Sequence, residues 1–204
     1  MTGQSIDWKR HADAVFAPLR SIDRSWLPAS LQRHTRLLDT AMRSPTTRRF
    51  LYRYLPAADA LAVNDIAEPG WAMGGYKHRQ QLVIRLGAFA CAIPLRHTID
   101  LSERAQLRHV LDDEIYQQVV KQGGTLVRSD ISEAYRQAMA SGDIAFLIAA
   151  MGISVLEHVA PQDRLFIQHH IRSQFARKVW AMRRKDLECD GDRAVEIINQ
   201  SGHV

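Results

Sequence analysis

The 204-residue sequence contains only two cysteines, which restricts the ways in which the chain can be held together. Cys91 and Cys189 lack the CxxC spacing of structural zinc sites and redox dithiols, and nothing in the sequence supports a disulfide between them. A chain of this length can bury roughly 70% of its unfolded surface in one core, so we expect neither a disulfide nor a metal to be needed. Such cysteine usage is typical of a reducing compartment.

Long apolar runs are also missing. The longest stretch without a charged side chain, residues 144–156, has 13 residues, whereas a membrane-spanning helix needs about 20. Lys9, Arg10 and Asp13 interrupt the region where a signal peptide would carry its apolar core. We therefore expect a cytoplasmic protein without a membrane span, and we interpret residues 144–156 as part of a core helix.

Glycine and proline are scarce, with eleven Gly and seven Pro, which excludes a collagen-like or linker-dominated chain. The hydrophobic fraction of 46% is too high for an intrinsically disordered protein. These values indicate an ordinary globular protein of one domain.

The compact motifs of catalysis are absent: the sequence has no GxxxxGK[ST] phosphate loop and no GxGxxG, HExxH or GxSxG pattern. The adjacent His169 and His170 would point about 100° apart on a helix and could not both face one metal ion. The carboxylates of Asp130, Glu133 and residues 112–114 lie at expected helix starts, where capping and the helix dipole account for them. We therefore expect no metal and no cofactor, although active-site residues dispersed along the chain would leave no local motif.

What the sequence does contain is a succession of helical patterns, with no sustained period-2 alternation of the kind that predicts strands. Asp100 and Asp130 begin capping-box patterns, and Gly142 is placed to end a helix. We predict an all-α, single compact multi-helix domain over residues 1–186, followed by an acidic, flexible carboxy-terminal tail over residues 187–204. The helices are expected at about residues 8–19, 28–42, 45–54, 76–92, 101–111, 115–122, 131–141 and 143–159, with a long basic one from 161 to 185.

The net charge of +5 is distributed unevenly. Residues 1–56 carry 10 basic and 4 acidic side chains, whereas residues 101–160 carry 5 and 8. Five cations near the end of the expected long helix exceed what its dipole would favour, so they are our candidates for partner binding: Arg177, Lys178, Arg183, Arg184 and Lys185. Together with the acidic residues 101–143, this cluster predicts two docking faces of opposite charge.

The order of several short segments resembles the SctK (YscK-like) accessory proteins of bacterial type III secretion systems, most strongly over residues 76–120. The segments that carry the resemblance are Trp26-Leu27-Pro28, Ser44-Pro45 leading into Arg48-Arg49-Phe50-Leu51, Arg85-Leu86-Gly87-Ala88, Leu95-Arg96-His97-Thr98-Ile99-Asp100, and Leu107-Arg108-His109-Val110-Leu111 before Ile115-Tyr116.

The resemblance implies a mainly helical, non-enzymatic adaptor of the cytoplasmic sorting platform, peripheral to the inner membrane through the secretion apparatus. Such proteins link the cytosolic domain of the inner-membrane ring protein SctD to the pod protein SctQ, and the platform also includes the stator SctL and the ATPase SctN. The family has no catalytic residues to place on this sequence.

Two other functions remain open at this stage. The sequence pI of about 9.5 would suit a helical nucleic-acid-binding protein that uses basic terminal helices, although the acidic centre argues against a continuous phosphate track. A helical enzyme whose active-site residues are dispersed along the chain would leave no local motif.

Overall fold

The computed structural model describes residues 23–27, 29–33, 69–72, 75–122, 124 and 126–201. The described chain is predominantly helical, and its β structure is limited to an isolated bridge between Val127 and Cys189. The predicted all-α fold is thus confirmed.

The chain divides into two compact units. The amino-terminal unit comprises Met1–Ala67 and Gln168–Arg177, and the helical body comprises Glu68–Ile167 and Lys178–Val204. In the amino-terminal unit the described elements are η2 (Arg24–Trp26), α2 (Ala29–Gln32) and η7 (Arg172–Gln174).

The helical body contains the longest helices of the described chain. Its elements are η4 (Gly70–Ala72), α5 (Gly75–Ala90), α6 (Ala92–His97), α7 (Leu101–Val110), α8 (Asp113–Gln122), α9 (Ser132–Ser141), α10 (Ile144–Val159), η5 (Pro161–Asp163), α11 (Arg164–Phe166) and α13 (Gly191–Ser201). Two further helices, η6 (Ile167–Ile171) and α12 (Arg177–Met182), include the residues at which the chain passes from one unit to the other.

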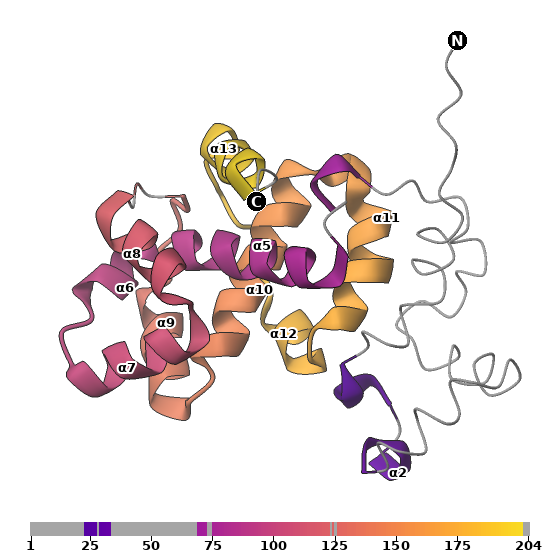
Figure 1. Ribbon diagram of the computed structural model, residues 1–204, viewed down its shortest axis with the longest axis horizontal. Coiled ribbons are helices and arrows are strands. Elements are labelled where there is room, and N and C mark those ends of the chain that lie inside the picture. Colours follow the sequence, from indigo (N-terminus) through magenta and orange to yellow (C-terminus); the bar gives the residue numbers. More distant parts are fainter. Residues whose placement is uncertain are drawn as a thin grey trace, which may run out of the picture. The chain divides into compact units, whose positions relative to one another are not determined.

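Helices α5 and α10 pack against each other in the core of the helical body (Figure 1). Their backbones approach so closely that a Cβ atom added at Gly87 would lie 1.8 Å from the carbonyl oxygen of Ile148. A Cβ atom added at Gly152 would lie 1.9 Å from the carbonyl oxygen of Val83. The two glycines therefore permit a backbone-to-backbone crossing that any side chain would prevent.

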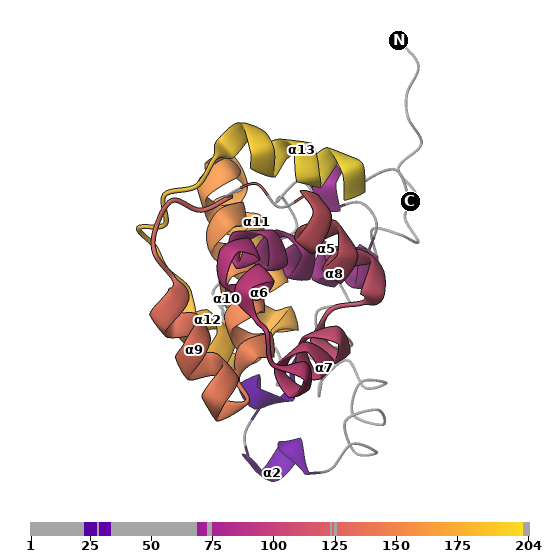
Figure 2. The ribbon, with the colours of Figure 1, turned by 90° about the vertical axis from the view of Figure 1, so that its left-hand side faces the viewer.

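The apolar run that we interpreted as a core helix does form one. Helix α10 begins at Ile144, as expected, and every residue from Leu147 to Leu156 is buried. Besides α5, α10 contacts α7, α9 and α13, while α8 and α6 pack on α5 (Figure 2).

Local capping signals set several helix boundaries, as predicted. The Asp100 carboxylate accepts hydrogen bonds from the backbone N–H groups of Ser102 (2.7 Å) and Glu103 (3.0 Å) and begins α7. Gly142 ends α9 in the left-handed conformation, with φ of 75°. The chain also breaks at Cys91 between α5 and α6, consistent with the expected effect of Pro94.

The predicted long basic helix from residue 161 to 185 is not confirmed. The helical path is interrupted at Phe175, whose backbone is extended (φ −120°, ψ 152°) and whose carbonyl accepts a hydrogen bond from the Trp26 indole (2.7 Å). It stops again after Met182, where the Arg184 N–H donates to the Ser154 hydroxyl (2.8 Å) instead of to a helical carbonyl. Hydrogen bonds to residues distant in the sequence replace those that would continue the helix.

The carboxy-terminal segment does not behave as the separate tail that we predicted, because residues 191–201 form α13. Ala194 and Ile197 are buried, and α13 packs on α5 and α10. The predicted helices at 8–19 and 45–54 lie outside the described residues, as does most of the one at 28–42.

Candidate partner-binding surfaces

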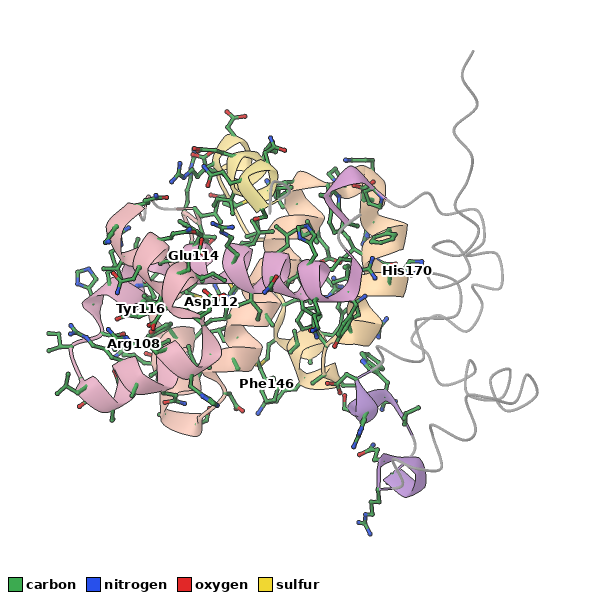
Figure 3. All side chains as sticks on the ribbon, viewed as in Figure 1. Arg108, Asp112, Glu114, Tyr116, Phe146 and His170 are labelled. Atoms are coloured by element: carbon green, nitrogen blue, oxygen red, sulfur yellow. The ribbon has the colours of Figure 1, made fainter. Side chains whose placement is uncertain are left out.

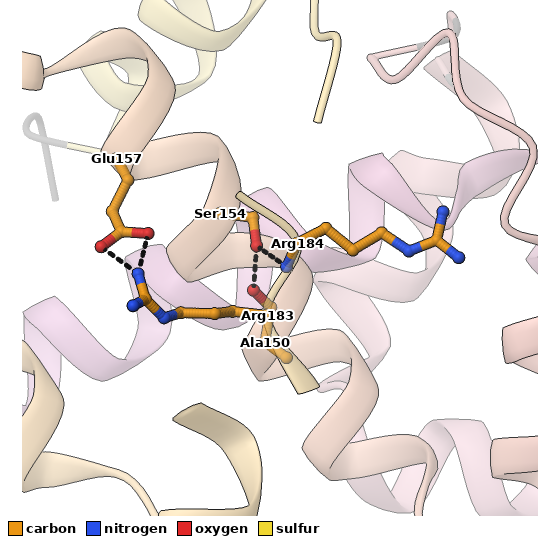
Figure 4. Close-up of polar contacts among 5 residues, drawn as sticks. All are labelled: Ala150, Ser154, Glu157, Arg183 and Arg184. Carbon is orange, nitrogen blue, oxygen red and sulfur yellow. Dashed lines mark hydrogen bonds and ion pairs between the residues drawn. The ribbon is translucent and has the colours of Figure 1, made fainter. Parts of the chain in front are cut away.

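Arg183, one of the five candidate cations, is engaged within the helical body. Its guanidinium donates to both carboxylate oxygens of Glu157 on α10 (2.6 and 2.5 Å), and each side chain is only 13% exposed (Figure 4). The same guanidinium lies 4.0 Å from the centre of the Trp180 ring. Arg183 therefore joins the segment after α12 to α10.

Lys178 also has a partner inside the helical body. Its ammonium donates to the Asp143 carboxylate (2.5 Å) and lies 5.5 Å from the centre of the Phe146 ring. This hydrogen bond is the main reason why the pKa of Asp143 lies below its usual value, and a further bond from Ser141 acts in the same direction. Lys178 thus neutralises a carboxylate at the start of α10.

Arg177 belongs to the amino-terminal unit, where it stacks on Trp26. The guanidinium groups of Arg172 and Arg177 lie 4.9 and 5.1 Å from the centre of the Trp26 ring. Arg177 also donates to the Trp26 carbonyl (3.3 Å). These contacts hold Trp26, which is buried, against the segment 172–177.

Arg184 and Lys185 are the two candidate cations whose exposed side chains form neither an ion pair nor a ring contact among the described residues. The backbone beneath Arg184 is nevertheless fixed, because the Ser154 hydroxyl that accepts from its N–H itself donates to the Ala150 carbonyl (2.9 Å). Figure 4 shows the Arg184 side chain extended away from this anchor. The predicted basic cluster is therefore reduced to two freely presented cations.

The expected acidic face is partly used by the helices themselves. Asp112 caps α8 by accepting from the Ile115 N–H (2.7 Å), and the Asp113 carboxylate lies 3.8 Å from Arg108 Nε. The Arg108 guanidinium also lies 5.5 Å from the centre of the Tyr116 ring, so a cation covers this part of α7 and α8 (Figure 3).

An exposed apolar surface between α6 and α7 was not anticipated from the sequence. Ile99 is 82% exposed and Leu101 79% exposed, and we call this pair the apolar ledge. Together with Ile93, at 45%, these residues are three of the five large apolar side chains that stand out as exposed in the described chain. All three fall within nine consecutive residues, which distinguishes them from singly scattered apolar residues.

The ledge is held in place by polar contacts on its inner side. Thr98 is buried, and its hydroxyl donates to the Pro94 carbonyl and lies 3.1 Å from the Tyr135 hydroxyl. Arg104 Nε donates to the Thr98 carbonyl (2.8 Å). Thr98 is thus held on the buried side of the segment, whereas the residues that follow it, Ile99, Asp100 and Leu101, are exposed.

A pocket of about 220 Å³ opens beside the start of α6. Its walls come from the α5–α6 junction and from the segment that precedes α9. The residues that line it are Ala90, Ile93, Pro94, Val127, Arg128, Ser129, Asp130, Ile131 and Ser132.

Comparisons with protein-family models, with curated proteins and with solved structures find no match for this chain. In the described ranges, no helix combines the length and the apolar character needed to cross a bilayer. The same residues contain no group of three or more His, Cys, Asp or Glu side chains arranged to hold a metal ion.

Proposed function

We propose that the chain is a non-enzymatic adaptor of a bacterial type III secretion sorting platform, similar to SctK, that links an SctD-like inner-membrane ring protein to an SctQ-like pod protein. In this proposal it acts in the cytoplasm, at the inner membrane, with SctL-like and SctN-like proteins as further members of the platform. The resemblance of residues 76–120 and the all-α fold support this function.

The observation that carries the proposal is the apolar ledge. Burying an isoleucine or leucine side chain contributes about 1.5–3 kcal/mol, so Ile99 and Leu101 are costly to leave in water. The contacts of Thr98 fix the ledge before any partner arrives, so little conformational entropy would be lost when it is covered. The ledge also lies in a segment on which the resemblance rests.

The nucleic-acid alternative has less support. Arg183 and Lys178 pair with carboxylates, and Arg177 stacks on Trp26, so most of the candidate cations are already engaged within their own units. The described cations that remain for a nucleic acid therefore form no continuous track along which a phosphate backbone could bind.

The test is co-purification of the full chain with the SctQ-like and SctD-like proteins of the same bacterium. The double variant Ile99→Asp/Leu101→Asp should lose at least one of these partners, while its thermal unfolding stays close to that of the wild type. The control Val195→Asp changes an exposed apolar residue of α13 and should bind both.

Failure of the wild-type chain to bind either protein at micromolar concentration would contradict the adaptor role. A salt-sensitive gel shift with nucleic acid would favour the alternative instead.

A further inference from the structure

The pocket beside α6 has the size and lining of a site for a side chain. Its volume of about 220 Å³ is below the roughly 300–1,000 Å³ of small-molecule sites, yet it exceeds an apolar cavity of about 150 Å³ that holds benzene. The apolar part of the lining comes from Ala90, Ile93, Pro94, Val127 and Ile131. One leucine or phenylalanine side chain would fit this space.

One cation of the pocket lining and a second one near it bear on the charge of the occupant. Arg128 lines the pocket, is exposed and forms no ion pair with a described residue. Arg184 does not line the pocket, but its positive charge acts on Asp130, which does.

Among the described residues, the carboxylates around the pocket form no ion pair with these two cations. Asp130 accepts a hydrogen bond from the Ser132 N–H (2.9 Å), so it is committed to the start of α9, and this bond is the largest cause of its lowered pKa. Glu188 accepts from the Arg128 N–H through its backbone carbonyl (3.0 Å), but its carboxylate forms no ion pair with Arg128.

The rim is held by the rest of the helical body. On either side of the Val127–Cys189 bridge, Arg128 donates to Glu188 and Asp190 donates to Leu126 (2.9 Å) through backbone groups. The backbone of Arg184 is fixed separately by Ser154. Both cations are therefore presented from an ordered backbone, which reduces the entropy lost on binding.

We infer that this pocket binds one apolar side chain of an acidic segment of a partner protein, whose carboxylates pair with Arg128 and Arg184. The apolar lining supplies affinity, and the two cations select acidic over basic segments. The inference rests on the proposed adaptor function in that the occupant is a protein segment, and it adds a second contact site to the apolar ledge.

The first test uses the isotopically labelled full chain and a synthetic dodecapeptide of glutamate and aspartate with one central phenylalanine. Saturable NMR shifts confined to residues 90–94, 127–132 and 184 are expected. A matched peptide with alanine for phenylalanine, and another with lysine for the acidic residues, should each bind at least tenfold more weakly. Shifts located elsewhere, or equal affinity for all three peptides, would overturn the inference.

The second test is the charge reversal Arg128→Glu/Arg184→Glu, which should weaken peptide binding at least tenfold. Its control, Lys77→Glu/Lys121→Glu, makes the same change in net charge at exposed lysines of α5 and α8 that do not line the pocket, and should bind like the wild type. Ile93→Ala should weaken binding severalfold through the pocket itself. A control that weakens binding as much as the rim variant would contradict the inference.

Two further measurements separate the possible occupants and the two proposals. A single-stranded dodecanucleotide that shifts the same residues more tightly than the acidic peptide would overturn the inference in favour of phosphate. If the wild-type chain co-purifies with platform proteins but the peptide does not bind its pocket, the inference fails while the adaptor function stands. If the peptide binds the pocket and no platform protein co-purifies, the adaptor function fails while the peptide site stands.

Discussion

Arg183 and Arg184 are adjacent in the sequence but occupy different environments. Arg183 pairs with Glu157 in a largely buried position, whereas the Arg184 side chain extends into solvent from an anchored backbone. An ion pair that is mostly shielded from water is costly to break, because the remaining charge stays desolvated. The two arginines therefore have separable roles in stability and recognition.

Arg183→Ala is expected to reduce the free energy of unfolding by about 2 kcal/mol, because Glu157 would lose two charged hydrogen bonds and Trp180 its stacked guanidinium. Urea denaturation followed by circular dichroism measures the loss. The matched variants Arg184→Ala and Lys185→Ala should each change stability by less than about 0.5 kcal/mol. Equal losses of unfolding free energy at all three positions would show that the Arg183–Glu157 ion pair contributes no more to stability than the two exposed side chains do.

The buried thiol of Cys91 makes the stability of the core depend on pH in the alkaline range. Burial raises the pKa of its thiol to about 12, whereas the thiol of an unfolded chain loses its proton near pH 9. Above pH 9 the unfolded state therefore binds fewer protons than the folded state, so stability falls as pH rises. Unfolding free energies measured from pH 8 to 10.5 should fall more steeply for the wild type than for Cys91→Ala, by up to about 1 kcal/mol per pH unit. Parallel pH profiles would contradict this assignment. Burial also raises the pKa of Tyr135 to about 12, and Tyr135 is present in both proteins.

At the scale of elements, the crossing of α5 and α10 depends on two glycines. Alanine normally stabilises a helix by about 1 kcal/mol relative to glycine. At Gly87 or Gly152 it would place a methyl group within 2 Å of a backbone oxygen of the facing helix, so the helices would have to move apart. We expect Gly87→Ala and Gly152→Ala each to lower the unfolding free energy by about 3 kcal/mol or more.

Gly191→Ala provides the control for this crossing. Gly191 begins α13, and a Cβ atom there would meet nothing within 4 Å. Thermal unfolding of the three variants should show large decreases in Tm for the two crossing glycines and none for Gly191. A neutral effect at Gly87 would mean that the helices can separate without cost.

Elements set by local signals could be predicted from the sequence. The cap at Asp100, the left-handed stop at Gly142 and the apolar period of α10 each depend on residues within a few positions, and each lies where it was expected. The break at Phe175 could not be predicted, because it depends on a hydrogen bond from Trp26, 149 residues earlier. Tertiary hydrogen bonds of this kind override local helix propensity.

The candidate site was only partly predictable for the same reason. Basic side chains can be counted in a sequence, but their pairing with Asp143 or Glu157 is a property of the fold. The exposure of Ile99 and Leu101 also depends on the fold, because the neighbouring Thr98 is buried and its hydroxyl lies against that of Tyr135, 37 residues later.

At the scale of the whole molecule, folding reduces the charge contrast between segments. Residues 177–185 belong to a basic part of the sequence, whereas Asp143, which precedes α10, and Glu157 within α10 belong to the acidic part. Lys178 and Arg183 each form an ion pair with a carboxylate of that acidic part, so some of the opposite charges neutralise each other inside the helical body. Encounter with partners then depends on the charges that stay exposed, Arg128, Arg184 and Lys185 among them.

The role of the carboxy-terminal segment in the helical body is also a property of the whole molecule. Ile197 and Ala194 are buried against the α5–α10 core, and the Ser201 hydroxyl accepts a hydrogen bond from Arg85 (3.3 Å). Ile197→Asp would place a carboxylate in that apolar contact, and we expect it to reduce the unfolding free energy by about 3 kcal/mol or more. Val195→Asp, on the exposed side of the same helix, should cost less than about 1 kcal/mol, which controls for the effect of aspartate on helix propensity.

Chemical denaturation of both variants, and of a chain ending at Asp190, measures how far the stability of the helical body depends on α13. If all three proteins unfold at the wild-type midpoint, residues 187–204 act as an independent tail; if Ile197→Asp and the truncation fall together while Val195→Asp does not, α13 is part of the core.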